Sequence, residues 1–167
     1  MIDVVLTVFG VFYVTFFFGH LLLILDLKYS DIILLLPFIT AWCTDTFAYL
    51  VGLTMGKRKL CPLISPKKSV EGAIGGALGC VASTAIFGGI VNAMGYPIPL
   101  IHFIVLGLLC GVFSQFGDLT ASLWKRYTGI KDFGKIFPGH GGILDRFDSI
   151  IFTLPIIYYY FTYIVLR

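Results

Sequence analysis

The sequence predicts an all-α fold, a polytopic membrane helical bundle with about five transmembrane helices and a long cytoplasmic loop. Hydrophobic residues make up 58% of the 167 residues and charged residues only 13%, whereas soluble domains are nearer half apolar and a quarter charged. The apolar residues form long continuous runs, which are typical of membrane-spanning helices and not of the alternating strands of a membrane barrel. We expect a single domain over residues 1–167.

Five apolar runs are the candidate spans, and each is near the length of about 20 residues that crosses a bilayer core. They cover residues 2–25, 32–53, 72–94, 100–124 and 150–166. Helices are expected because backbone groups in lipid must be satisfied within the segment. A polar segment at residues 56–71, a short turn at 95–99 and a polar loop at 125–144 separate the later spans.

Basic residues gather in the second and fourth connections, which lie on the same side of the membrane if there are five spans. They are Lys57, Arg58, Lys59, Lys67 and Lys68 in the second, and Lys125, Arg126, Lys131, Lys135 and Arg146 in the fourth. The first connection has only Lys28 and the third has no lysine or arginine. Because basic loops favour the cytoplasmic side, we expect these two loops to face the cytoplasm and the C-terminus to lie opposite.

Asp45 and Asp118 lie inside apolar runs, although an acidic residue within a span costs about 2.5–3.5 kcal/mol on insertion scales. One interpretation of such a residue is a buried structural contact or a position near the lipid headgroups, without a functional role. For Asp118 a second feature favours a site, because small and polar residues share its helix face at steps of three and four. This face comprises Gly107, Gly111, Ser114, Asp118, Ser122 and Lys125.

Small residues allow a neighbouring helix to approach closely, so we expect packing at the glycine end of this face and a polar cavity at the other end. A packing seam alone would explain Gly107 and Gly111 but not Asp118. The pairs Gly72 with Gly76 and Gly75 with Gly79 are likewise expected to pack helices together.

The fourth connection runs KRYTGIKDFGKIFPGHGGILDRFD from Lys125 to Asp148, and connections of this length are usually functional or disordered. Apolar anchors within it argue for order. Asp145 and Asp148 stand three residues apart at the start of the last span. Carboxylates with lysine and arginine nearby suit a phosphate ligand carried by Mg²⁺. The residues alone therefore indicate a membrane enzyme or transporter that handles a phosphorylated ligand.

Two blocks of the sequence resemble the phosphatidate cytidylyltransferase family, in its C-terminal catalytic half. The first runs from Ser122 through KR, KD and PGHGG to DRFD at Asp148, with Trp124 where an aliphatic residue or Phe is usual. The second combines DTFAY from Asp45, GKRKL from Gly56 and ISPKKSVEG from Ile64, with Ser69 where Thr is common. The resemblance covers the chain from about residue 40 to the end of the last span.

This resemblance implies an enzyme that makes CDP-diacylglycerol and pyrophosphate from CTP and phosphatidic acid in phospholipid biosynthesis. It places Mg²⁺, with a second cation left open, on Asp118 and Asp145, and we add Asp148 and Ser122 as supporting ligands. The resemblance also implies roles in catalysis for Asp118, Asp145, Lys125 and Lys131. It implies substrate binding by Lys67, Lys68, Ser122, Arg126, His140 and Arg146. We expect Asp45 to shape the polar cavity, and Asp132 to act either as a ligand or as an acceptor that orders the loop.

The expected partners are CTP, phosphatidic acid and the bilayer, with no nucleic acid and with a homodimer left open. The expected location is the cell membrane, as a multi-pass protein whose active site faces the cytoplasm. Family members are longer and have further spans ahead of this region, so we expect the chain to lack their N-terminal helices.

Three alternatives remain at this stage. An enzyme like CDP-archaeol synthase is also short and membrane-bound, although the PGHGG and ISPKKS runs fit the bacterial-type family better. A small transporter would explain the intramembrane carboxylates but not the glycine- and lysine-rich loop, and it would be favoured by internal repeats, which we do not see. A fragment that needs its missing half for activity is the third.

Overall fold

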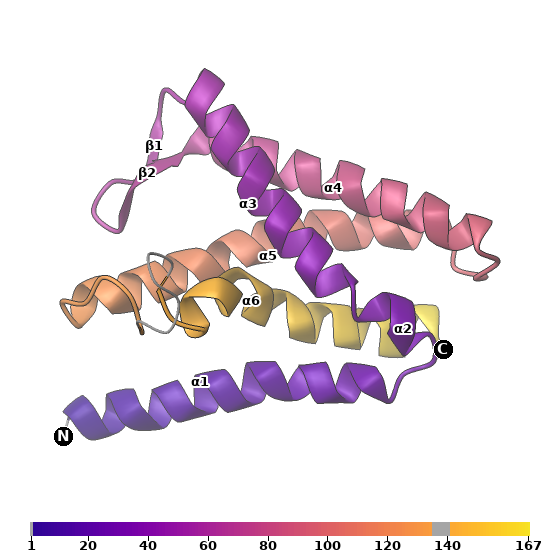
Figure 1. Ribbon diagram of the computed structural model, residues 1–167, viewed down its shortest axis with the longest axis horizontal. Helices are drawn as coiled ribbons and strands as arrows, with labels where there is room; N and C mark the ends of the chain where they lie inside the picture. Colours follow the sequence, from indigo (N-terminus) through magenta and orange to yellow (C-terminus); the bar gives the residue numbers. More distant parts are fainter. Residues whose placement is uncertain (1, 135–140) are drawn as a thin grey trace.

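The structure is a computed structural model that describes residues 2–134 and 141–167, and it is a bundle of long helices (Figure 1). Its elements are α1 (Ile2–Leu25), α2 (Ser30–Ile33), α3 (Leu36–Met55), β1 (Lys59–Cys61), β2 (Ser65–Ser69), α4 (Val70–Ala93), α5 (Leu100–Tyr127), α6 (Leu144–Tyr160) and a π-helical turn (Phe161–Val165). Within the described chain, five helical segments are long and apolar enough to cross a membrane. The predicted fold class and number of spans are therefore confirmed.

The helices pack mainly against their neighbours in sequence, so that α3, α4, α5 and α6 form a continuous series and α1 lies against α6. The chain reverses direction at each connection. The strands β1 and β2 therefore lie at the same end of the bundle as the start of α1 and the connection between α5 and α6 (Figure 1). The C-terminus lies at the other end. The prediction that both basic connections share one end is confirmed.

Two helix boundaries differ from the prediction in a way that matters for the site. α5 continues to Tyr127 and α6 begins at Leu144, whereas the apolar runs stop at residue 124 and start again at 150. Hydropathy marks where a span leaves lipid, but helical hydrogen bonding continues into polar sequence. Asp145 and Asp148 therefore lie within the first two turns of α6 and point from a rigid element.

The second span contains a break that hydropathy did not reveal. α2 ends at Ile33, and α3 begins at Leu36 with Pro37 in its first turn. Proline is well tolerated there because the first amide groups of a helix have no partner within the helix.

Glycines bring α4 close to both of its neighbours. A Cβ atom on Gly76 would lie 2.8 Å from the Thr44 carbonyl oxygen and 2.9 Å from the Ala48 Cβ of α3. A Cβ atom on Gly111 of α5 would lie 3.0 Å from the Cys80 Cβ of α4. These approaches need the absence of a side chain, so the predicted packing role of the glycines is confirmed.

The second connection forms a β-hairpin, which was not predicted. β1 and β2 are antiparallel, with Lys59 opposite Ser69. The Glu71 Oε2 accepts hydrogen bonds from the amides of Lys57 and Arg58 at 3.1 and 3.2 Å. The Ser69 hydroxyl caps α4 by accepting from the Gly72 amide at 3.1 Å, as N-cap serines do. The hairpin is thus tied to the start of α4.

The apolar core lies toward the end opposite the hairpin. Ile24, Ile33, Phe103, Leu154 and Phe161 are fully buried there. Beyond this core the Tyr96 hydroxyl donates to the Asp31 carboxylate, and this hydrogen bond raises the pKa of Tyr96 above its usual value.

We predict that Gly76→Ala lowers the free energy of unfolding by about 1–3 kcal/mol, because overpacking of a tight contact has that cost. The matched control is Gly89→Ala on the same helix, where an added Cβ meets nothing within 4 Å. Unfolding in mixed detergent micelles measures both variants. Equal stability of the two would contradict the assigned packing role.

Candidate functional site

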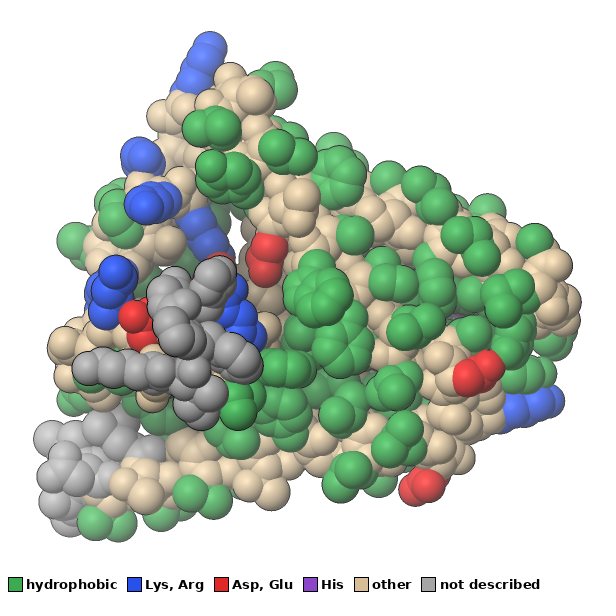
Figure 2. All heavy atoms as spheres, viewed as in Figure 1, with side chains coloured by type: hydrophobic (Ala, Val, Ile, Leu, Met, Phe, Trp, Pro, Cys, Tyr) green, Lys and Arg blue, Asp and Glu red, His purple; other side chains and the backbone are tan. Residues whose placement is uncertain are grey.

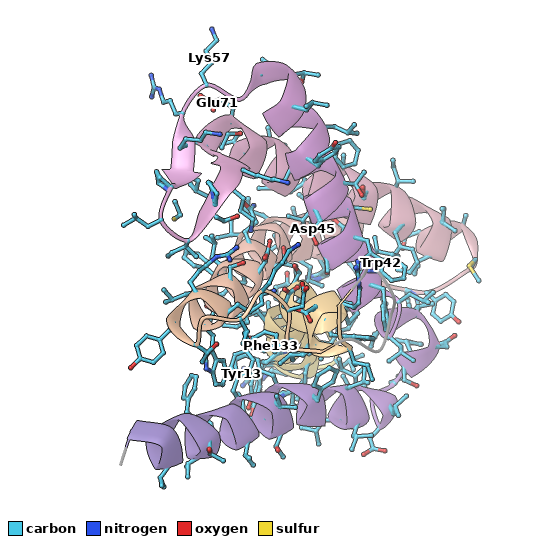
Figure 3. The ribbon with its side chains drawn as sticks, turned by 60° about the vertical axis from the view of Figure 1, so that its left-hand side comes forward. Tyr13, Trp42, Asp45, Lys57, Glu71 and Phe133 are labelled. Carbon is cyan, nitrogen blue, oxygen red and sulfur yellow. The ribbon has the colours of Figure 1, made fainter. Side chains whose placement is uncertain are left out.

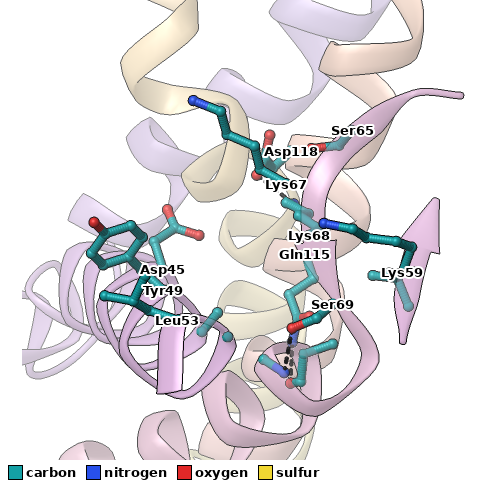
Figure 4. Close-up of a pocket in the computed structure, with 15 residues that line it drawn as sticks. Asp45, Tyr49, Leu53, Lys59, Ser65, Lys67, Lys68, Ser69, Gln115 and Asp118 are labelled. Atoms are coloured by element: carbon teal, nitrogen blue, oxygen red, sulfur yellow. Dashed lines mark hydrogen bonds and ion pairs between the residues drawn. The ribbon is translucent and has the colours of Figure 1, made fainter. Parts of the chain in front are cut away.

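A polar cavity of about 510 Å³ opens at the hairpin end of the bundle. α3, the hairpin, α4 and α5 all contribute to its walls. Asp45 and Tyr49 of α3 lie on one side of it, and Lys67 and Lys68 of β2 with Asp118 of α5 lie on the other (Figure 4). Figure 2 shows lysine and arginine side chains gathered over this same end. The polar cavity expected beyond the small residues of α5 is therefore present.

Asp118 is held between the hairpin and its own helix. Its carboxylate forms an ion pair with Lys68 and accepts a hydrogen bond from the Ser122 hydroxyl at 3.2 Å. About a quarter of the Asp118 and Lys68 side chains is exposed, so ligands can reach the pair from the cavity. Fifty residues separate the two partners in sequence, and the hairpin is what brings Lys68 to the carboxylate.

Asp145 organises the connection between α5 and α6. Its Oδ1 accepts from the Lys125 ammonium at 3.0 Å. Its Oδ2 accepts from the amides of Phe133 and Gly142 at 2.8 and 2.9 Å. Gly141, just before, has a φ of 82°, a conformation that glycine adopts without a steric penalty. One carboxylate therefore fastens both described parts of the loop to α6.

Asp148 lies one turn after Asp145 on α6, and its carboxylate shares Lys125 with Asp145. Its Oδ2 is 3.8 Å from the Lys125 ammonium. Gly117 permits this arrangement, because its Cα packs against the backbone carbonyl of Asp148. The carboxylates of Asp118, Asp145 and Asp148 thus gather around one end of the bundle.

An aromatic cluster supports Lys125 from the side of α1. The Lys125 ammonium lies 5.3 Å from the centre of the Phe133 ring, a distance typical of a cation–π contact. Trp124 packs edge-on against Phe133 and against Tyr13 of α1, and Figure 3 shows Tyr13 and Phe133 near each other. α1 therefore packs directly beneath the loop.

The other predicted basic residues that the structure describes are more exposed than Lys68 and Lys125. Lys67 is exposed and lines the cavity. Arg126 is exposed, and its Nε donates to the Ile64 carbonyl at 3.4 Å, which links α5 to the hairpin. Lys131 and Arg146 are exposed on the loop and the first turn of α6. His140 lies outside the described residues.

Three residues line or support the site that the sequence interpretation did not single out as site residues. The Ser149 hydroxyl donates to the Asp45 carboxylate at 3.2 Å and so joins α6 to α3. The Gln115 amide of α5 donates to the carbonyls of Ala73 and Gly111 at 3.0 and 2.8 Å. Lys59 lines the cavity from β1. Gln115 carried a usable signal, because a polar amide inside an apolar run requires a partner.

Within the described residues, no three His, Cys, Asp or Glu side chains form a group that could by itself hold a metal ion. Carboxylate oxygens of the kind that Mg²⁺ prefers are nevertheless present, each beside a lysine. Lysines and carboxylates so arranged can bind phosphate oxygens and can also share a divalent cation with them. The arrangement suits phosphoryl chemistry at a membrane surface.

Comparison with known proteins gives a match to the model of the cytidylyltransferase family over residues 1–164. A phosphatidate cytidylyltransferase of Bacillus subtilis is 47% identical over 121 residues, which are 72% of this chain and 44% of the relative. Its counterparts from Staphylococcus saprophyticus and Staphylococcus aureus strain COL are 44% and 45% identical over 74% of this chain and 46% of each relative. The chain thus spans about half the length of these relatives.

We predict that Lys125→Met destabilises the fold by about 3–5 kcal/mol, because loss of one partner from a buried ion pair leaves an uncompensated charge. Only 13% of the Lys125 side chain and 7% of the Asp145 side chain are exposed. Thermal unfolding in detergent tests this value. Lys131→Met is the control and should stay within about 0.5 kcal/mol, as exposed substitutions usually do.

The double variant Lys125→Met with Asp145→Asn separates loss of charge balance from loss of packing. It should recover part of the stability, since Asp145 then carries no charge without its lysine, whereas the Asp148 carboxylate still lacks its contact with Lys125. A double variant less stable than the lysine variant alone would contradict the ion-pair explanation.

Proposed function

The chain belongs to the cytidylyltransferase family, and from this membership we propose that it carries the catalytic part of a phosphatidate cytidylyltransferase. A phosphate oxygen of phosphatidic acid attacks the α-phosphorus of CTP and forms a new P–O bond. The bond between the α-phosphorus and the bridging oxygen to the β-phosphorus breaks. CDP-diacylglycerol stays in the membrane and pyrophosphate leaves. The observation that carries this proposal is the pairing of Lys68 with Asp118 and of Lys125 with Asp145 at one end of a membrane bundle.

The lysines of the cavity have the chemistry for binding two phosphorylated substrates. Lys59, Lys67 and Lys68 line its wall on the hairpin side, where they can neutralise phosphate oxygens. Phosphoryl transfer needs chiefly positioning and stabilisation of charge on the transferring group. Lys68 and Lys125 come from separate elements and can serve both needs. Arg126 positions the hairpin through Ile64, and its charge adds to the field around the opening.

Asp118, Asp145 and Asp148 would hold Mg²⁺ in this proposal. They fit the ion by donor type, since Mg²⁺ prefers hard oxygen ligands and commonly bridges one or two carboxylates to substrate phosphates. Because no three acidic side chains of the described residues form a group that could hold a metal ion alone, substrate phosphates would complete the coordination. Lys68 and Lys125 pair with these carboxylates and balance part of their negative charge. When bound, Mg²⁺ would supply Lewis-acid stabilisation of the negative charge on the phosphates.

The site would face the cytoplasm, where the basic connections are favoured and where CTP is available. Five spans would then place the C-terminus on the opposite side. A homodimer stays a prediction, and chemical cross-linking in native membranes would test it. The alternative of an enzyme like CDP-archaeol synthase differs in its lipid, so a parallel assay with an archaeal ether lipid acceptor distinguishes it. Membership in the family does not favour the transporter.

We predict that the purified protein transfers label from α-³²P-labelled CTP to phosphatidic acid in mixed micelles only when Mg²⁺ is present. Asp118→Asn or Asp145→Asn should lower this rate by at least about 100-fold, because each removes a carboxylate proposed to hold the Mg²⁺ that stabilises charge on the transferring phosphoryl group. Labelled dATP and GTP test selectivity for the base.

Asp26→Asn is the matched control, because Asp26 is exposed and follows α1 at the opposite end of the bundle. It should retain full activity. Transfer that continues in EDTA, or full activity in either site variant, would refute the assignment of these carboxylates. Membrane insertion of each variant is checked by its yield in the detergent-extracted fraction.

A further inference from the structure

An apolar groove of about 410 Å³ runs along the outer side of α4 and α5 beside the hairpin. Ile74 and Ala77 of α4 form one wall, and Val112, Phe116 and Leu119 of α5 form the other. Ile74 is 57% exposed and Phe116 is 54% exposed. In a helix that crosses a membrane, side chains with this exposure face lipid.

The groove adjoins the polar cavity described above. Leu60, Ala73 and Gln115 line both, so the two spaces meet along a shared wall. The Gln115 amide is held there by hydrogen bonds to Ala73 and Gly111, and its position marks the change from charged to apolar surroundings. On the cavity side lie Lys68 and Asp118, and on the groove side lie aliphatic and aromatic groups.

We propose that this groove holds one acyl chain of the lipid substrate while the lipid phosphate lies among the lysines of the cavity. This inference rests on the proposed function and adds the place where the lipid tail binds. Charge complementarity supports it, because an anionic head matches Lys59, Lys67 and Lys68. From Val70 to Ala77 the groove follows α4 for about 10 Å, given a rise of 1.5 Å per residue. It therefore holds the first part of a chain and leaves the rest in the bilayer.

An amphiphile explains the groove better than a protein partner does. A second copy of the chain, or a further helix, would cover the apolar walls but would not match the lysines that line the adjoining cavity. A diacyl phosphate fills both spaces with matching chemistry. It also enters from the membrane, where its chains already lie, so that only its head must move toward Asp118.

The first test uses photo-crosslinking. Protein in bilayer nanodiscs is irradiated with phosphatidic acid that carries a diazirine on one acyl chain, and labelled peptides are mapped by mass spectrometry. We expect the label on Ile74, Val112 or Phe116, with competition by unlabelled phosphatidic acid. Phosphatidylcholine with the same diazirine chain is the control and should label these residues no more than the remaining lipid-facing surface.

The second test fills the groove. Ile74→Trp should raise KM for dioleoyl phosphatidic acid by roughly tenfold, which corresponds to about 1.4 kcal/mol. It should leave kcat nearly unchanged, because the chain contact is equal in the ground state and the transition state. KM for water-soluble dihexanoyl phosphatidic acid should change less. The matched control is Ile86→Trp, three turns further along α4 and 67% exposed, which should alter neither KM.

Equal labelling by the two lipids, or equal KM values for the two tryptophan variants, would overturn the assignment of the groove. So would photo-crosslinks from a lipid chain that avoid the groove because another polypeptide covers it. Selective labelling without any transfer from CTP would instead refute the proposed reaction and leave the lipid site standing. The two proposals therefore fail by different results.

Discussion

Neutralisation of carboxylates inside an apolar bundle is the constraint on which the site depends. Asp45, Asp118 and Asp148 lie in helical segments long and apolar enough to cross a membrane, and an unpaired carboxylate within a membrane span is costly. Lys125 contacts both Asp145 and Asp148, and Lys68 contacts Asp118. Each lysine comes from a different element than its partner, so charge balance also sets how the hairpin, α5 and α6 meet.

Close helix packing determines where those charges can gather. Gly76 and Gly111 let α3, α4 and α5 approach to backbone contact. At the hairpin end the residues on the same face of α5 are larger and polar, and the helices enclose a cavity instead. The hairpin then fills part of the opening and reaches in with Lys68. A single face of α5 thus changes from packing seam to binding wall along its length.

The sequence was sufficient for the features that depend on local pattern. Apolar runs predicted the spans, and Asp118 stood out because a charge inside such a run is rare. Features that depend on contacts between distant segments could not be predicted from the sequence. The pairing of Lys68 with Asp118 needs the hairpin, whose three-residue strand β1 has too little alternation to be recognised. The hydrogen bond from Ser149 to Asp45 depends on the rotation of α6 about its own axis relative to α3. The periodicity of a single segment does not predict that rotation.

The depth of Asp118 limits how the two substrates of the proposed reaction can arrive. It lies nine residues before the end of α5 at Tyr127, which is about 14 Å along the helix. In the proposed reaction a nucleotide would reach Asp118 from the hairpin end, where Lys67 and Arg126 are exposed. A lipid cannot use that route without exposing its chains to water, at a cost of about 0.8 kcal/mol per CH₂ group. Lateral entry beside Gln115 would avoid this cost, so the cavity and the groove that share Gln115 suit a water-soluble and a lipid substrate in the proposed reaction.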